Sequence, residues 1–184
     1  MNERDILNLI KSDPWMMKVL EVAASLNLPD WMIGAGFVRN RVWDHLHELN
    51  NEKVQTKDID LIYYDPSDLS RETEKEFEKR LKKILDINWE VRNQARMHEK
   101  RERTESYKNS VEAMSGWPET ATAIGVKLDS DGDLKLFAPH GIDDLTNLIV
   151  RPTPVFKNDL TVFWKRIEDK NWLKIWPKLK VVTD

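Results

Sequence analysis

Apolar positions along the chain alternate between helical and strand spacing. Residues 15–26 carry an apolar helical stripe after Asp13-Pro14, a pair typical of a helix start. A short apolar run at 31–33 leads into Gly34-Ala35-Gly36, and a second helical stripe follows over 38–49. The first quarter of the chain is therefore predicted to form a helix, a strand, a tight turn and a second helix.

The middle of the chain predicts two strands joined by a helix. Residues 57–64 have the apolar character of a strand, and residues 70–86 form a strongly charged segment with one apolar stripe. The mixed charges of that segment indicate a solvated helix face. Residues 87–92 alternate, so that Glu90 and Arg92 share the polar face of the second strand.

The second half of the chain is predicted to end in helices. Residues 120–138 read as a β-hairpin, residues 141–150 as a short helix, and the segment from Asn158 onward as helix. The order of elements predicts an α+β (mixed α/β) fold with a central mixed sheet flanked by helices. We expect a single domain over residues 1–184, with a core at 30–155 and a helical tail at 156–184.

Composition narrows the class of protein. Of 184 residues, 40% are hydrophobic, 33% are charged and eight are tryptophan, which indicates a folded globular chain. The absence of cysteine excludes disulfides, thiol nucleophiles and thiolate metal sites. No apolar run approaches the ~18 residues of a membrane span, and residues 1–10 lack the apolar core of a signal peptide. A cytoplasmic protein without a membrane partner is expected.

The charge balance limits the partners. The chain has 29 basic and 32 acidic residues and a net charge of −3, which argues against a DNA-coating role. Small-molecule, protein and localised RNA partners stay open.

Three carboxylates are the candidate catalytic and metal-binding residues. Asp58 and Asp60 are two positions apart on a predicted strand, so they point to the same face and repel each other unless a cation lies between them. Mg²⁺ or Mn²⁺ suits such oxygen ligands. Glu90, on the polar face of another strand, is the candidate third acid, and Asp143-Asp144 is the alternative source.

The glycine turn and three arginines are the candidate phosphate ligands. Gly34, Ala35 and Gly36 follow a strand and precede a helix, where backbone amides are able to bind phosphate. The same pattern also fits a plain turn. Arg39 is either a phosphate ligand or a structural pairing residue. Arg92 and Arg96 are the members of the basic stretch 92–103 closest to the predicted carboxylate site.

Taken together, these motifs resemble those of the nucleotidyltransferase superfamily, typified by polymerase β and the tRNA CCA-adding enzymes. Residues 35–40 (AGFVRN) are similar to the G-G-x-V-R-D motif of the CCA-adding and poly(A) polymerase branch, from which Ala35 and Asn40 depart. Residues 57–61 (KDIDL) resemble its D-I-D strand, and residues 89–91 (WEV) resemble its third-acid strand. The chain as a whole resembles a family of short bacterial nucleotidyltransferase-like proteins.

The resemblance implies an activity and a cofactor. A metal-dependent enzyme would transfer a nucleoside monophosphate from an NTP, with ATP among the candidates, to an acceptor hydroxyl on a small molecule, a protein or an RNA end. Two other functions use the same residues. The chain is alternatively a non-catalytic nucleotide-binding or regulatory protein, or an RNA-binding protein that uses the basic stretch 92–103.

Overall fold

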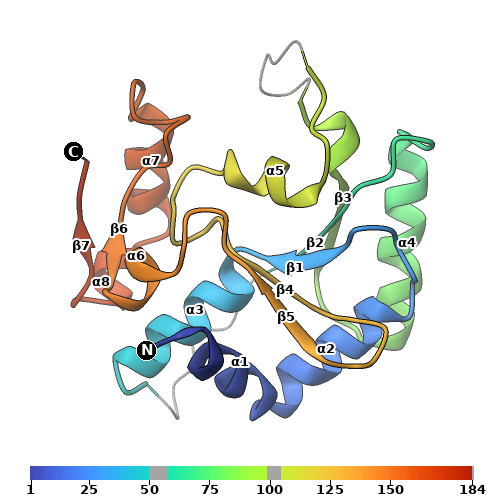
Figure 1. Cartoon of the computed structure of the whole chain (residues 1–184), viewed down its shortest axis with the longest axis horizontal. Helices are drawn as coiled ribbons and strands as arrows, with labels where there is room; N and C mark the ends of the chain where they lie inside the picture. The colour runs from blue at the N-terminus through green and yellow to red at the C-terminus, as the bar shows by residue number, and fades with distance from the viewer. Residues whose placement is uncertain (50–57, 99–104, 184) are drawn as a thin grey trace.

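A five-stranded mixed sheet lies at the centre of the computed structural model, which describes residues 1–49, 58–98 and 105–183 (Figure 1). Across the sheet the strands run in the order β3-β2-β1-β4-β5. Their bounds are β1 (Met32–Gly34), β2 (Ile59–Tyr63), β3 (Trp89–Asn93), β4 (Gly125–Leu128) and β5 (Leu134–Phe137). The mixed α/β fold expected from the sequence is confirmed.

Helices cover both faces of the sheet. The main hydrophobic cluster joins one face to α1 (Glu3–Lys11), α2 (Pro14–Ala24), α3 (Gly36–Leu46) and α4 (Arg71–Ile84). A smaller cluster around Met32, Ile62 and Met114 joins the other face to α5 (Ser110–Ser115), and Figure 1 shows α5 opposite α1 to α3. Within the described residues, no helix has the length and apolar character needed to span a bilayer.

The pairing of β2 with β3 is parallel, whereas the other neighbours in the sheet are antiparallel. Helix α4 makes the crossover between these two strands, as parallel pairing requires. The register pairs Asp60 with Glu90, so the two acids stand side by side on one face. Ile59, Leu61 and Val91 point to the opposite face, into the main core.

Strand β3 is an edge strand whose outer amides are bound by α4. The Val91 amide donates to Glu78 Oε1 at 3.0 Å, and the Asn93 amide donates to Glu74 Oε1 at 2.8 Å. Two carboxylates of the charged helix therefore serve as acceptors that a neighbouring strand would otherwise supply. This use of α4 was not predicted, since its charges indicated a solvated face.

Local signals place the helix starts correctly. Asp13 accepts hydrogen bonds from the amides of Trp15 and Met16, and Ser70 accepts them from Glu72 and Thr73. The predicted strands and the hairpin are confirmed within a few residues. Helix α1 was not predicted.

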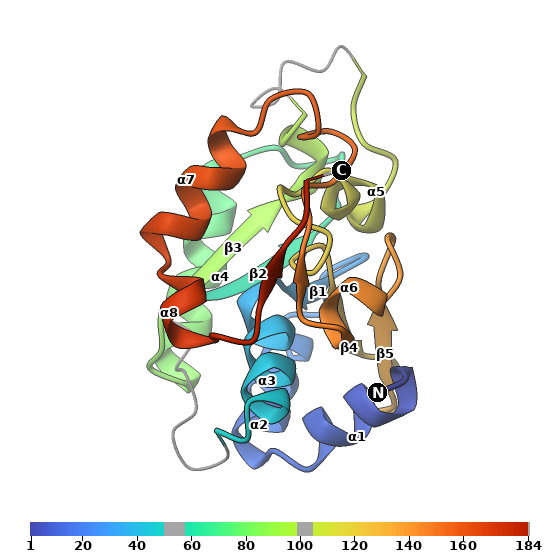
Figure 2. The same ribbon diagram turned by 90° about the vertical axis from the view of Figure 1, so that its left-hand side faces the viewer.

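The C-terminal segment folds back onto α3 (Figure 2). It contains α6 (Asp143–Thr146), α7 (Thr161–Asp169) and α8 (Trp172–Ile175), with β6 (Ile149–Val150) and β7 (Lys180–Val181) forming a small parallel sheet. The Trp43 ring meets Trp172 and Trp176 edge-on, at centroid distances of 5.6 and 5.1 Å. Trp176 Nε1 also donates to Asp44 Oδ1 at 2.9 Å. The segment thus shares the main core instead of extending from it.

Gly34 is a packing residue of β1. A Cβ at this position would lie 2.7 Å from Trp117 Cη2 and 3.2 Å from the Ile124 carbonyl oxygen. The close approach of an indole ring and a backbone carbonyl therefore requires glycine here.

We expect Gly34→Ala to destabilise the protein by about 1–3 kcal/mol, because the added methyl overpacks this contact. Chemical denaturation measures the free energy of unfolding. The matched background is Trp117→Leu, which removes the ring that the methyl would meet. Equal destabilisation by Gly34→Ala in both backgrounds would contradict this explanation.

Candidate active site

A cavity of about 410 Å³ opens beside the β1–α3 turn. The turn and β2 form one wall, and α7 and α8 form the other. The lining residues are Ala35, Gly36, Arg39, Asn40, Asp58, Asp60, Arg166, Asp169, Lys170, Asn171, Trp172, Ile175 and Trp176.

Asp58 and Asp60 bring two carboxylates into this cavity. Burial above all, and then the negative charges of Asp58 and Glu90, raise the pKa of Asp60 to about 6, while Lys170 and Arg39 act in the opposite direction. The sheet thus holds acids together against their mutual repulsion, which is the donor arrangement that suits a hard divalent cation.

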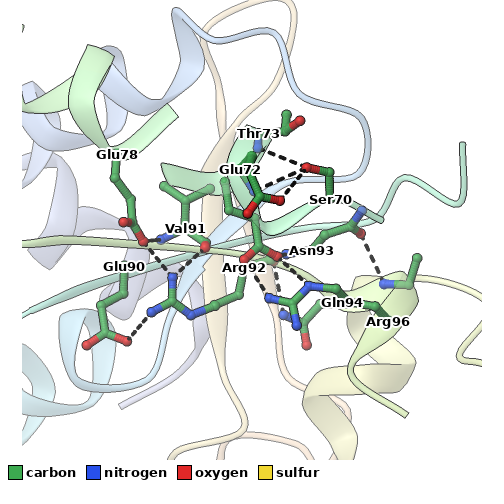
Figure 3. A network of polar contacts seen from close by, with 12 residues as sticks. Ser70, Glu72, Thr73, Glu78, Glu90, Val91, Arg92, Asn93, Gln94 and Arg96 are labelled. Carbon is green, nitrogen blue, oxygen red and sulfur yellow. Dashed lines mark hydrogen bonds and ion pairs between the residues drawn. The ribbon is translucent and has the colours of Figure 1, made fainter. Parts of the chain in front are cut away.

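Glu90 shares the face of Asp60 but is turned toward an arginine. Its Oε2 lies 3.3 Å from Arg92 Nη2 (Figure 3). Glu90 is not among the residues that line the cavity. Among the described residues, no three histidine or acidic side chains stand close enough to hold a metal ion as a group. Asp58 and Asp60 therefore fit the cation as a pair. Glu90 would join them only by leaving Arg92.

The alternative acids of α6 lie elsewhere. Asp143 and Asp144 do not line the cavity. Asp144 accepts hydrogen bonds from the Thr120 hydroxyl at 2.7 Å and from Arg151 Nε at 3.1 Å. These contacts give Asp144 a role in joining the β6 region to the segment before β4.

The N-terminus of α3 faces the cavity without a side-chain cap. Ala35 is its N-cap residue, with φ 55° and ψ −123°, and no side chain accepts from the first-turn amides. Those amides and the positive end of the helix dipole are suited to an anion. Of the predicted phosphate ligands in this turn, Ala35 and Gly36 line the cavity. Gly34 does not, because it lies in β1 against Trp117.

Arg39 is a buried cation in the floor of the cavity. It is 4% exposed; Nη1 donates to Thr122 Oγ1 at 2.7 Å, and Nη2 donates to Asn40 Oδ1 at 2.9 Å. The guanidinium carbon lies 4.4 Å from the centre of the Trp172 ring. Burial lowers the pKa of Arg39 to about 10, so the group stays charged at neutral pH. Its Nε is buried without a partner in the described structure.

Arg92 and Arg96, the two other predicted phosphate ligands, are held in ion pairs (Figure 3). Neither arginine lines the cavity. Arg92 Nη1 lies 2.5 Å from Glu78 Oε1. Arg96 makes a two-point contact with Glu74, which is 2% exposed and needs a cationic partner. Both arginines thus neutralise the α4 carboxylates that bind β3. Residues 99–103 of the predicted basic stretch lie outside the described residues, as does Lys57.

The second wall of the cavity was missed by sequence reasoning. Arg166, Lys170 and Trp172 come from the segment that the sequence assigned to a helical tail. Arg166 and Lys170 are four positions apart, which places them on one side of a helix, but Lys165 and Lys174 nearby offered equal charges. Only the packing of the tryptophans on α3 decides which cations face the carboxylates.

Comparisons with known proteins agree with this architecture. A family model described as nucleotidyltransferase matches residues 21–181. An NMR structure described as revealing a CCA-adding enzyme head domain is 35% identical, with a TM-score of 0.86, over 100% of this chain and 97% of that one. The curated protein sequences give no match.

Larger CCA-adding enzymes share the fold. The structure of a CCA-adding enzyme with CTP has a TM-score of 0.59 and 15% identity over 99% of this chain. The Thermotoga maritima CCA-adding enzyme complexed with tRNA has a TM-score of 0.57 and 16% identity, also over 99%. This chain spans 43% and 42% of those two proteins.

The family model covers most of the chain, and the likeness to the head domain extends over its whole length. The chain belongs to the nucleotidyltransferase family.

Proposed function

We propose that this protein is a metal-dependent nucleotidyltransferase that moves a nucleoside monophosphate from an NTP to an acceptor hydroxyl. The observation that carries the proposal is the pairing of Asp58 and Asp60 in one cavity with the uncapped N-terminus of α3. Acids suit a divalent cation and helix amides suit phosphate, so the two features together suit a metal–triphosphate ligand.

Asp58 and Asp60 would hold Mg²⁺ or Mn²⁺. Such an ion, when bound, offsets phosphate charge and lowers the pKa of a coordinated hydroxyl. The first amides of α3 and the Arg39 guanidinium would bind phosphate oxygens, with the unpartnered Nε of Arg39 as a donor. The stacking of Arg39 on Trp172 and its bond to Thr122 fix that cation before the ligand arrives.

The transfer forms one bond and breaks another. The acceptor oxygen bonds to the α-phosphorus as the bond from that phosphorus to the β-phosphate oxygen breaks, and pyrophosphate leaves. The hydroxyl proton needs an acceptor, and we assign Glu90 to this role or to metal binding, on the face that it shares with Asp60.

The acceptor is proposed from the comparisons. The structures that share the fold include CCA-adding enzymes with CTP, with ATP and with tRNA. They support an NTP as donor and favour an RNA 3′ end as acceptor over a small molecule or a protein hydroxyl. Incubation with α-labelled NTPs, Mg²⁺ and unmodified RNA tests the transfer directly, since a labelled RNA product requires all three.

The two aspartates are expected to control nucleotide binding. Asp58→Asn and Asp60→Asn should each weaken Mg²⁺-dependent binding of CTP or ATP by about 10- to 100-fold, because a neutral amide is a poorer ligand for the cation. Calorimetric titration with Mg²⁺ and with EDTA measures the effect. Asp86→Asn, at a side chain that is 84% exposed, is the control and should bind as wild type. Tight binding that is indifferent to EDTA and to both substitutions would refute the metal site.

Glu90 is expected to act on turnover more than on binding. Glu90→Gln should lower the rate of transfer by about 100-fold or more while nucleotide affinity changes little, if it accepts the proton. Asp143→Asn is the matched control, since it removes an exposed acid of the alternative pair. A slow Asp143 variant beside a normal Glu90 variant would reverse the assignment of the third acid.

Asp60 is also expected to destabilise the metal-free protein. Its pKa of about 6 in the native state lies above the ~3.9 of an unfolded aspartate, so the native state binds the proton more tightly. Wild type should therefore lose stability relative to Asp60→Asn as the pH rises from about 4 to about 6. Above that window the variant should stay more stable by about 3 kcal/mol.

Urea denaturation in EDTA across this pH range measures the difference, with Asp86→Asn as the control. A stability difference between Asp60→Asn and wild type that is flat with pH would contradict the predicted repulsion.

A further inference from the structure

The wall formed by α7 and α8 brings two cations, beside the acid Asp169, to the cavity that holds the paired aspartates. Arg166 and Lys170 line the cavity one helical turn apart. They face a wall that holds Asp58 and Asp60. A ligand in the cavity would therefore meet the paired aspartates and, from α7, two cations beside one acid.

Arg166 is fixed by a buried acid. Its Nε donates to Glu119 Oε1 at 2.6 Å, and its Nη2 donates to Glu119 Oε2 at 3.3 Å. Glu119 is fully buried, so this two-point contact compensates a carboxylate that would be costly without a partner. Arg166 thus attaches α7 to the segment before β4, and much of its charge is offset by Glu119.

Helix α8 is held in place by its contacts with α3. Trp172 lies over Arg39 and packs edge-on against Trp43, while Trp176 donates to Asp44. The three tryptophans and Arg39 are each at most 4% exposed. The junction between α7 and α8 is therefore held from both ends.

Lys170 lies at that junction, as the C-cap residue of α7. Its charge acts on Asp60 across the cavity, and its ammonium group makes no hydrogen bond or ion pair with the described residues. The C-terminal end of a helix attracts a cation, which favours the position of this side chain at the end of α7. Unlike Arg166, Lys170 has its donors available to a ligand.

We propose that Lys170 binds the phosphate groups of the nucleotide from the wall opposite the α3 N-terminus, so that the site needs α7 and α8 as well as the carboxylates. This inference rests on the proposed function. A lysine acts on phosphate as a point charge with three donors, so its contribution should grow with the number of phosphates on the ligand. Lys170 thus makes the site bind a nucleoside triphosphate in preference to a monophosphate.

The test compares Lys170→Met with Lys174→Met, a lysine of α8 that does not line the cavity. Titrations with CTP, ATP, CMP and AMP in Mg²⁺ give the dissociation constants. We expect Lys170→Met to raise the constant for the triphosphates about tenfold and that for the monophosphates much less. Lys170→Arg should restore most of the triphosphate affinity, and Lys174→Met should bind as wild type.

The outcomes separate the two proposals. Wild-type triphosphate binding that Lys170→Met leaves unchanged would overturn the role of Lys170 and spare the proposed function. An equal loss for mono- and triphosphates, or an equal loss in Lys174→Met, would also overturn it. A wild-type chain that binds neither CTP nor ATP would overturn both proposals. Thermal unfolding of each variant checks the fold, and no shift is expected at these exposed side chains.

Discussion

Parallel pairing of β2 with β3 is the constraint on which the arrangement of this molecule depends. Parallel strands need a crossover, and α4 supplies it. The crossover places β3 at the edge of the sheet, where Glu74 and Glu78 of the same helix bind its outer amides. It also fixes the register that sets Glu90 beside Asp60. An antiparallel neighbour joined by a short turn would not have brought an acid from thirty positions away to the same face.

The arginines and lysines near the site fall into two groups: those that pair with acids of the fold and those that are available to a ligand. Arg92 and Arg96 neutralise the two α4 acids that hold the edge strand, and Arg166 neutralises the buried Glu119. Arg39 and Lys170 remain beside the carboxylates of the cavity without an acidic partner in direct contact among the described residues. Among the cations that line the cavity, Arg39 and Lys170 are thus the ones that the fold does not use to pair a buried acid.

Much of the fold could be predicted from the sequence because its signals are local. Caps at Asp13 and Ser70 mark helix starts, and alternation at residues 87–92 assigns Glu90 to the polar face. The carboxylates of the candidate site are predicted from the same kind of local signal, the alternation of residues along a strand. The second wall does not, because it depends on Trp172 and Trp176 packing against Trp43 more than a hundred positions earlier. The sequence shows several cations between positions 165 and 174, but not which of them faces Asp60.

The contact between Trp176 and Asp44 spans 132 positions, and that between Arg39 and Thr122 spans 83. The acids and the glycine turn are joined by much shorter loops. Closing a longer loop costs more entropy, so the carboxylate wall is expected to form early in folding and the α7–α8 wall late. The elements that form last in folding are expected to separate first in partial unfolding. Helices α7 and α8 are therefore able to separate from α3 while the sheet stays intact. A population of such molecules would have native strands and helices by circular dichroism and yet lack half of the nucleotide site.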